Sequence, residues 1–300
     1  MSAERRDGEA VDAARPAIAI QTGELNVVGV SKSYGAVQMR KEVVRDCSFT
    51  IERGKLTVMI GPSGCGKSTI IRLLAGFDAP TTGTVTLDGV PVTGPSLDRL
   101  VLFQETALFP WMTTWDNVMY GPRARGEADG EAVKLAEFLL HKVGLREFRD
   151  KYPGQLSGGM QRRAELARAM VNNPKVMILD EPFRGLDAMT KELMWEYYSR
   201  LYEENRRTNF FVTTDIDEAV FLADRLLVMS NTPTQVRAVI DVDLPRPRRL
   251  ADLVESDRAN DIKKQALSIL HAEAMRSFSR GSKAAADFVE AYLKRESRGT

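Results

Sequence analysis

The chain has 300 residues, which is long enough to bury one large core or two smaller ones. Its 42 basic and 41 acidic residues leave a net charge of +1, so composition favours neither a nucleic acid nor an anionic membrane surface as a partner. The two cysteines, Cys47 and Cys65, do not resemble a disulfide framework, and we expect a reducing compartment.

The N-terminal residues 1–22 are expected to form a disordered tail. Residues 1–17 are polar and charged, and they lack the apolar centre of a signal peptide. No apolar run in the sequence approaches the roughly 20 residues that a membrane-spanning helix needs. If the protein works at a membrane, we expect it to do so through a partner.

The next elements predict strands, a glycine-rich loop and a helix. Cys47, Phe49 and Ile51 alternate with polar residues, as on a half-buried strand, and the apolar residues 56–60 predict a buried central strand. The glycine-rich loop is followed by a predicted helix at residues 67–75, which Gly76 is placed to end. Residues 100–103 predict a further buried strand.

From residue 109 the pattern changes. Prolines and tryptophans come first, and apolar residues then recur at helical spacing over residues 131–143. We interpret residues 109–160 as a helical insertion in an α/β core.

Strands and helices alternate again after residue 160, which is typical of an α/β fold. Helices are predicted near residues 160–171, 193–201 and 216–223, and strands at residues 176–179, 210–212, 226–229 and 236–244. A Pro/Arg-rich stretch then ends the main domain, residues 23–245, and its side chains Arg246, Arg248 and Arg249 are expected to form a solvated cluster. Residues 246–300 are expected to form a helical C-terminal extension.

A phosphate-binding loop is predicted at residues 61–68. Its sequence matches the pattern G-x-x-x-x-G-K-[ST], follows an apolar strand and opens a helix. Glycines let backbone N–H groups turn toward an anion, and the helix N-terminus adds a favourable field. Lys67 has the reach to contact the β- and γ-phosphates of ATP, and the Ser68 hydroxyl is a ligand for Mg²⁺. The candidate nucleotide-binding residues here are Gly61, Pro62, Ser63, Gly64, Cys65, Gly66, Lys67, Ser68 and Thr69.

Two acids follow the apolar strand at residues 176–179. Asp180 is placed to hold Mg²⁺ through water, and Glu181 is placed to polarise an attacking water as a general base. An apolar run that ends in Asp-Glu is weak evidence alone, since it also fits a buried strand with a solvated end. Downstream of a phosphate-binding loop it becomes a strong signal.

The segment Leu-Ser-Gly-Gly-Met at residues 156–160 lies just before a predicted helix and ahead of Asp180. This segment closely resembles the signature segment of ABC transporter ATPases, whose final position is often Gln and here is Met160. The resemblance to that family runs over about residues 27–244. The resemblance implies a P-loop NTPase core of ABC type, an inserted helical subdomain and a small antiparallel β portion near the N-terminus. In sequence detail the chain is most similar to the nitrate, sulfonate, taurine and bicarbonate importer branch.

The resemblance also implies roles for particular residues. Tyr34 corresponds to the aromatic residue that stacks on adenine, although a role in the core is the alternative. Gln104 corresponds to a residue that senses Mg²⁺ and the attacking water, so it joins both the metal ligands and the catalytic residues. The signature residues Ser157, Gly158 and Gly159 would meet the γ-phosphate bound to a second subunit, and Asp187 would lie in the loop that crosses the dimer interface.

The partners are implied in the same way. They are a second ATPase subunit, identical or different, transmembrane permease subunits and, indirectly, a periplasmic or extracellular solute-binding protein, with no nucleic acid. The expected location is the cytoplasmic face of the inner membrane. Exposed aromatic residues at 109–115 would suit docking of a permease helix, and core packing of the tryptophans is an equal alternative.

Two positions depart from the family pattern. Thr214 stands where the family places a histidine that contacts the γ-phosphate, so the catalytic set becomes Glu181, Gln104, Lys67 and Thr214. Because losing a preorganised donor at a developing charge costs about 10²–10³ in rate, we expect weakened hydrolysis. Arg184 stands where small residues are usual, and both an interface charge and a solvated side chain remain open.

Three functions compete at this stage. The leading one is an ATP-hydrolysing motor subunit of an importer for a small anion or organic solute. A nucleotide-dependent regulatory or non-catalytic partner subunit in a heteromeric ABC complex is the alternative, and phosphate-release assays separate the two. A soluble ABC-type ATPase that acts on DNA or ribosomes would instead bind nucleic acid with strong salt dependence.

Overall fold

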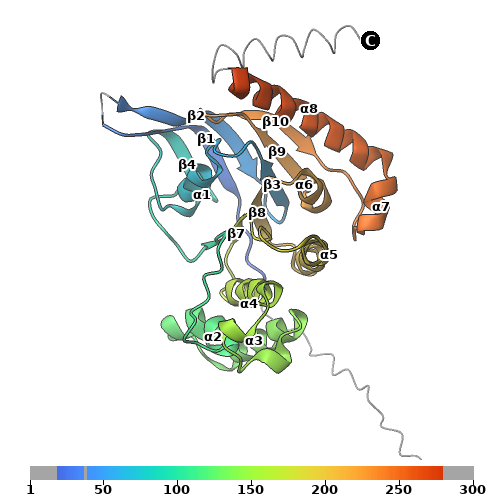
Figure 1. Cartoon of the computed structure of the whole chain (residues 1–300). Helices are drawn as coiled ribbons and strands as arrows, with labels where there is room; N and C mark the ends of the chain where they lie inside the picture. Colours follow the sequence, from blue (N-terminus) through green and yellow to red (C-terminus); the bar gives the residue numbers. More distant parts are fainter. Residues whose placement is uncertain (1–18, 37–38, 280–300) are drawn as a thin grey trace, which may run out of the picture. The chain divides into compact units, whose positions relative to one another are not determined.

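The computed structural model describes residues 19–36 and 39–279 (Figure 1). Within this part the chain divides into two compact units. We name residues 20–106 and 173–279 the sheet unit, and residues 107–172 the helical unit. Most of the predicted N-terminal tail, residues 1–18, and residues 280–300 of the predicted extension lie outside the described residues.

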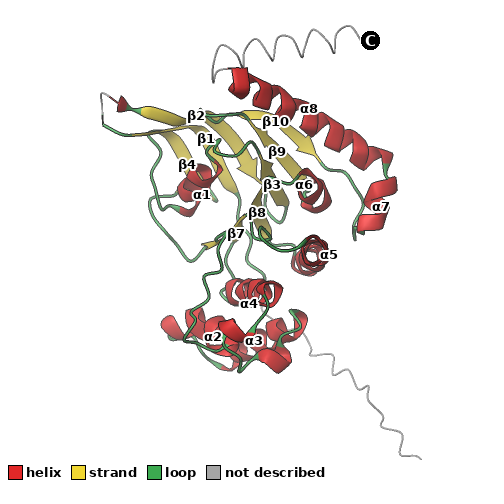
Figure 2. Ribbon diagram, in the orientation of Figure 1, coloured by secondary structure: helices red, strands yellow, loops and turns green. Residues whose placement is uncertain are grey.

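The centre of the sheet unit is a six-stranded sheet (Figure 2). Across it the strands are β10 (Val236–Asp241), β9 (Arg225–Met229), β3 (Leu56–Ile60), β8 (Thr208–Thr213), β7 (Val176–Asp180) and β6 (Arg99–Leu102). All neighbouring pairs are parallel except β9 and β10. The apolar runs of β3 and β8 are buried along their whole length, as expected for central strands of a parallel sheet. The loops after β3, β6, β7 and β8 therefore leave from one edge of the sheet.

A second, antiparallel sheet is built from the first strands of the chain. Its order is β2 (Lys41–Ile51), β1 (Leu25–Tyr34), β4 (Thr82–Leu87) and β5 (Val90–Pro91). The alternation predicted on β2 is present, since Cys47, Phe49 and Ile51 are all buried while their neighbours are more exposed. This sheet is the small antiparallel portion that the resemblance implied.

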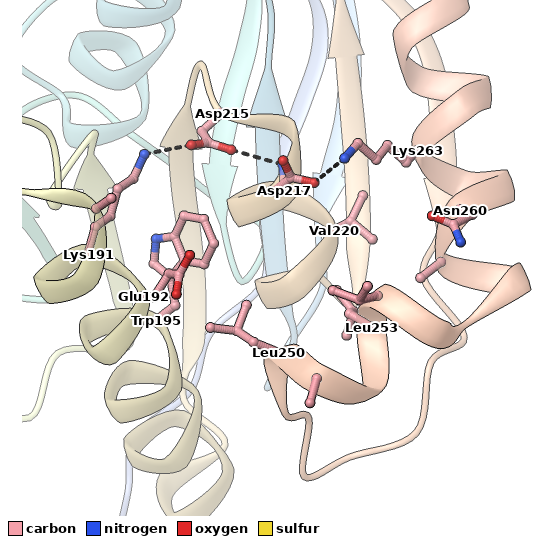
Figure 3. Close-up of a pocket in the computed structure, with 14 residues that line it drawn as sticks. Lys191, Glu192, Trp195, Asp215, Asp217, Val220, Leu250, Leu253, Asn260 and Lys263 are labelled. Carbon is pink, nitrogen blue, oxygen red and sulfur yellow. Dashed lines mark hydrogen bonds and ion pairs between the residues drawn. The ribbon is translucent and has the colours of Figure 1, made fainter.

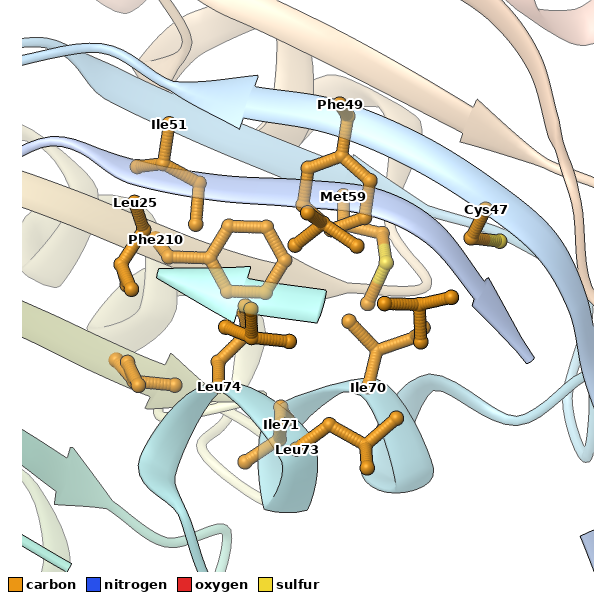
Figure 4. Close-up of a cluster of buried hydrophobic side chains, with 14 of the residues drawn as sticks. Leu25, Cys47, Phe49, Ile51, Met59, Ile70, Ile71, Leu73, Leu74 and Phe210 are labelled. Carbon is orange, nitrogen blue, oxygen red and sulfur yellow. The ribbon is translucent and has the colours of Figure 1, made fainter. Parts of the chain in front are cut away.

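One hydrophobic core joins both sheets to helix α1 (Lys67–Ala75), as Figure 4 shows. Ile70 and Leu74 lie on the buried side of α1, and the ring of Phe49 on β2 stacks on that of Phe210 on β8, with centroids 6.1 Å apart. Each fully buried side chain of this size stabilises the fold by about 1.5–3 kcal/mol. This packing fixes the helix, so its first turn is held at the end of β3.

The remaining helices of the sheet unit are α5 (Ala188–Asn205), α6 (Ile216–Leu222), α7 (Leu250–Glu255) and α8 (Asp257–Ser279). The predicted helix near residues 193–201 is thus part of α5. Its buried face carries Trp195 and Tyr198, whereas Leu193 points outward and is 66% exposed. Helix α6 packs on β3, and α8 packs on α6 and β9.

The arginines after β10 differ from the expected solvated cluster. Arg248 is 6% exposed, and its guanidinium donates to five backbone carbonyls, of residues 220, 221, 223, 242 and 244. Arg246 pairs with Asp224 at 2.9 Å and with Glu203 at 3.5 Å. Buried carbonyls and carboxylates need donors, and long guanidinium side chains reach them. These two residues therefore fasten the start of the C-terminal extension to the sheet unit.

The helical unit contains α2 (Thr114–Ala124), α3 (Gly130–Lys142) and α4 (Gly158–Met170), with short 3₁₀ turns at Arg146–Phe148 and Pro153–Gln155. Side chains of Thr113, Asp129 and Ser157 cap the three helices by accepting N–H groups of their first turns. Such caps contribute about 1 kcal/mol each. Each of these three helices therefore begins at a capping residue that belongs to the helical unit itself.

No helix within residues 19–36 and 39–279 is both long and apolar enough to cross a membrane. The mixed sheet, the antiparallel sheet and the separate helical unit agree with the α/β fold class predicted from sequence.

Candidate functional site

The glycine-rich loop, residues 61–68, lies between the end of β3 and the first turn of α1. Gly64 and Gly66 have φ angles of 74° and 115°, a left-handed backbone that other residues avoid. A Cβ on Gly66 would also approach the Thr234 hydroxyl to 2.9 Å. Gly66 is the N-cap of α1, and no side chain caps that helix. The N–H groups of Thr69 and Ile70 already donate to the Gly66 carbonyl, and the field of the uncapped helix start favours an anion.

Lys67 is folded back over this loop. Its Nζ donates to the carbonyl oxygens of Gly61, at 2.9 Å, and Pro62, at 3.1 Å, and the residue is only 7% exposed. An anion seated on the loop would meet an ammonium that is already in place. Replacing neutral carbonyl partners by a phosphate would give stronger hydrogen bonds, because the acceptor would then carry a charge opposite to that of the ammonium.

The loop is braced by two threonines between β9 and β10. Thr232 donates from its hydroxyl to the Gly64 carbonyl at 3.0 Å, and the Thr234 hydroxyl donates to the Cys65 carbonyl. These bonds hold two carbonyls of the loop and so help to fix its conformation. Cys65 itself is buried, which raises the pKa of its thiol, so this residue packs as a neutral side chain. No local motif marks either threonine in the sequence, since they lie more than 160 positions from the loop.

Asp180 ends β7 at the same sheet edge. Burial raises the pKa of its carboxyl, and the Glu181 carboxylate raises it further, while Lys67 and Arg184 act in the opposite direction. A cation beside Asp180 would relieve the cost of burying this charge. Together with Ser68 and Gln104, Asp180 offers hydroxyl, carboxylate and amide oxygens, the ligands that Mg²⁺ prefers.

Among the described residues, no three His, Cys, Asp or Glu side chains gather as a metal site. Mg²⁺ rarely needs such a cage, because it keeps several waters and takes oxygens from phosphates. The residues present therefore fit a magnesium ion that arrives with a nucleotide.

Glu181 follows Asp180 in an unusual backbone conformation. Its φ is 41°, its side chain is nearly buried, and its N–H donates to the Val212 carbonyl at 2.9 Å. Its Oε2 accepts from Nη1 of Arg184 at 3.1 Å, and the same Nη1 lies 3.4 Å from Oε1 of Gln104. Strain of this kind costs about 1–3 kcal/mol and collects at functional sites. The structure thus brings Glu181 and Gln104 to one guanidinium.

Thr214 lies at the end of β8, the strand that pairs with β7. Its side chain is exposed and lines a cavity of about 110 Å³ together with Glu181 and Arg184. Just before it, the Thr213 hydroxyl donates to the buried carboxyl of Glu218, whose pKa burial raises to about 7. The residue after β8, which we expect to contact the γ-phosphate more weakly than a histidine would, is therefore neutral.

Tyr34 and Asp187 occupy two other edges of the sheet unit. Tyr34 ends β1 with its ring 38% exposed; its hydroxyl donates to Asp78 at 2.9 Å, and Lys32 lies 5.0 Å from the ring centroid. Asp187 caps α5 by accepting the Thr190 N–H at 3.0 Å, and hydrogen bonds from Thr190 lower the pKa of its carboxyl. The partly exposed ring of Tyr34 offers surface for stacking on a base, and an exposed capping carboxylate suits a surface loop.

The signature residues belong to the helical unit. Ser157 is the N-cap of α4 and accepts the Met160 N–H at 3.3 Å, while Gly158 and Gly159 form the first helical positions. Trp111 of the same unit is 70% exposed, with Phe109 5.5 Å from it between ring centroids. The helical unit thus presents a helix start and an exposed aromatic side chain.

A larger cavity of about 650 Å³ lies in the sheet unit among α5, α6, α7 and α8 (Figure 3). Lys191 pairs with Asp215 at 2.6 Å on one side of it, and Lys263 of α8 pairs with Asp217 on the other. Both lysines are matched by carboxylates, and Glu192 adds one further acid to the lining.

A sequence model described as ABC transporter matches residues 44–184. The chain is 39% identical over 258 residues to a nitrate import ATP-binding protein of Synechococcus elongatus, which covers 85% of this chain and 94% of the relative. It is also 39% identical over 236 residues to the taurine import ATP-binding protein of Pseudomonas aeruginosa, with 79% and 90% covered. A bicarbonate transport ATP-binding protein of Synechocystis shares 39% over 265 residues, with 87% and 94% covered.

Among solved structures, the chain is similar to a dimeric ATP-binding cassette in a post-hydrolysis state with ADP and phosphate bound. The TM-score is 0.62 and the identity 27%, and the match covers 74% of this chain and all of the other. The similarity confirms the predicted P-loop core of ABC type.

Proposed function

The chain belongs to the family of ABC transporter ATP-binding subunits, in the branch that includes nitrate, bicarbonate and taurine importers, and from this we propose that it is the ATP-hydrolysing motor of an importer. The observation that carries the proposal is the glycine-rich loop with Lys67 folded over it, which leads into the uncapped start of α1. Asp180 and Glu181 lie at the same edge of the sheet. These features supply a phosphate cradle, a metal-binding acid and a base.

We assign nucleotide binding to residues 61–69, with the loop N–H groups and Lys67 holding the phosphates. The exposed ring of Tyr34 would stack on adenine. Ser68, Asp180 and Gln104 would hold Mg²⁺, which when bound neutralises charge on the phosphates. Each of these groups lies in the sheet unit, and each uses a side chain or N–H group at a strand end or helix start.

For hydrolysis, Glu181 would accept a hydrogen bond from the attacking water, and Gln104 would help to orient that water. Thr214 offers a hydroxyl in place of the family's histidine, so it can donate a hydrogen bond but brings no positive charge. We therefore propose that turnover is slower than in relatives that carry the histidine.

The functional form would be a dimer in which residues 157–159 and Asp187 of one subunit complete the site of the other. The solved cassette to which this chain is similar is itself dimeric. The exposed Trp111 of the helical unit would contact a permease helix, and closure of the dimer on ATP would move the permease. A peripheral position on the cytoplasmic face of the membrane follows from this role. The similarity to nitrate, bicarbonate and taurine ATP-binding proteins supports a small anion or organic solute of the nitrate, sulfonate or taurine type.

The test replaces Glu181 by Gln. The variant is expected to bind ATP with Mg²⁺ as tightly as the unchanged protein, to release phosphate at least about 100-fold more slowly, and to accumulate as an ATP-bound dimer. Glu196→Gln, on an exposed ion pair of α5, is the matched control and should change neither property. Undiminished phosphate release by Glu181→Gln would refute the proposal, and failure of the unchanged protein to hydrolyse ATP with its permease would favour the regulatory alternative.

A further inference from the structure

Arg184 lies in the loop after β7, three residues beyond Glu181, and its guanidinium faces the candidate catalytic groups. Nη1 donates to Oε2 of Glu181 at 3.1 Å and lies 3.4 Å from Oε1 of Gln104. One guanidinium is thus shared by two polar side chains, which follow the ends of two strands.

The loop conformation directs this contact. The Arg184 N–H donates to the Glu181 carbonyl at 3.1 Å, which closes a turn, and Gly185 follows with φ of 83°. The turn places residue 184 beside the side chain of residue 181, on the side where Gln104 leaves β6. A chain reversal of this kind fixes the base of the side chain even though its tip is exposed.

The other nearby cations are occupied elsewhere. Lys67 donates to two carbonyls of the glycine-rich loop, and Lys191 is bound to Asp215 at 2.6 Å. The cavity that Glu181 lines also receives Arg184 and the neutral Thr214. Arg184 is therefore the cation in direct contact with the Glu181 carboxylate within residues 19–36 and 39–279.

We infer that Arg184 is a positioning residue for hydrolysis, which orients the Glu181 carboxylate and the Gln104 amide toward the attacking water. Holding Oε2 of Glu181 directs its other oxygen, Oε1, to the water, and the shared Nη1 keeps Gln104 beside it. The inference rests on the proposed function, ATP hydrolysis at this site. Arg184 acts on that reaction through Glu181 and Gln104.

If Arg184 served only to stabilise the fold, its removal would have a different effect. The Arg184 side chain is 61% exposed, and an exposed ion pair contributes only about 0–1 kcal/mol to folding. Misplacement of a catalytic group by about 1 Å, in contrast, can cost 100-fold in rate. Removing Arg184 should therefore have a large effect on the rate of ATP turnover and only a small effect on the free energy of unfolding.

The experiment compares Arg184→Ala, Arg184→Lys and the matched control Arg200→Ala, which removes another exposed arginine from an ion pair with a glutamate in the same unit. Steady-state phosphate release and equilibrium ATP binding are measured for the full chain assembled with its permease. We expect kcat of Arg184→Ala to fall about 10- to 100-fold with ATP affinity changed less than about threefold. Arg184→Lys should recover part of kcat because it keeps a charged donor, and Arg200→Ala should behave as the unchanged protein.

Turnover of Arg184→Ala within about twofold of the unchanged protein would overturn the inference, since positioning would then be unnecessary. Faster turnover would overturn it too, because Arg184 would instead be restraining Glu181. A parallel Glu181→Gln measurement separates the two levels of the account. If Glu181→Gln still hydrolyses ATP, the proposed site itself fails; if it does not and Arg184→Ala is unaffected, only the role of Arg184 fails.

Discussion

The buried carboxyl of Glu218 makes the stability of the sheet unit depend on pH in a way that one substitution should abolish. Glu218 is 3% exposed, its Oε1 accepts from Trp195 Nε1 at 2.6 Å, and its Oε2 accepts from the Thr213 hydroxyl. Burial raises its pKa from 4.5 to about 7, although these donors and Lys191 act in the opposite direction. In the folded protein the Glu218 carboxyl is therefore mostly protonated below pH 7.

The sign of the effect follows from the proton balance. Between pH 4.5 and 7 the folded chain holds a proton on Glu218 that the unfolded chain has released, so the free energy of unfolding falls as pH rises. At about 1.4 kcal/mol per pKa unit, the full loss is about 3 kcal/mol by pH 8. Glu218→Gln keeps the shape and a neutral amide, and it should not show this loss.

The assay is urea unfolding, followed by circular dichroism, of both proteins at half-unit steps from pH 4.5 to 8. The free energies of unfolding should be similar at pH 4.5, and the variant should gain on the unchanged protein by up to about 3 kcal/mol as pH rises to 8. Curves that run parallel across the whole range would refute the reasoning, because Glu218 would then titrate alike in both states.

Three further perturbations test other parts of the account. Thr214→His should raise kcat of the assembled complex, by up to about 100-fold if the missing donor is the main deficit, and an unchanged kcat in phosphate-release assays would contradict the expected weakness. Gly66→Ala should abolish ATP binding in calorimetry, because φ of 115° is strained for alanine and its Cβ would meet the Thr234 hydroxyl at 2.9 Å; normal affinity would show that the loop adapts. Glu273→Ala should lower the free energy of unfolding by about 1–3 kcal/mol, because the Asn231 N–H loses its acceptor, Oε2 of Glu273, at 3.1 Å. An unchanged urea midpoint would argue that α8 does not hold the loop between β9 and β10.

The local signals in the sequence predicted the phosphate-binding region closely. The predicted helix at residues 67–75 coincides with α1, and Gly76 ends it with φ of 77°, because glycine and the apolar spacing act within one turn of the chain. The buried run at residues 56–60 likewise coincides with β3. Short-range signals of this kind need no knowledge of what packs against them.

Features that depend on distant contacts could not be predicted in this way. The sequence predicts a helix near residues 193–201 but not its buried face, which is set by the aromatic core in which Phe183 and Phe211 pack against Tyr198. The cluster of arginines at residues 246–249 predicts a solvated Arg248, because arginine side chains are mostly exposed, whereas carbonyls from several elements surround it. Thr234, which braces the glycine-rich loop, gives no motif at all in the sequence.

The roles of the individual site residues remain predictions, and the most direct measurement of them concerns Lys67. ATP binding with Mg²⁺ should be measured by titration calorimetry for Lys67→Ala and for Lys55→Ala, an exposed lysine paired with Glu52. Loss of a charge-assisted contact of about 1.5–3 kcal/mol predicts affinity at least about 10-fold weaker for Lys67→Ala and unchanged for Lys55→Ala. Equal affinities for the two variants would contradict the claim that residues 61–68 bind the triphosphate.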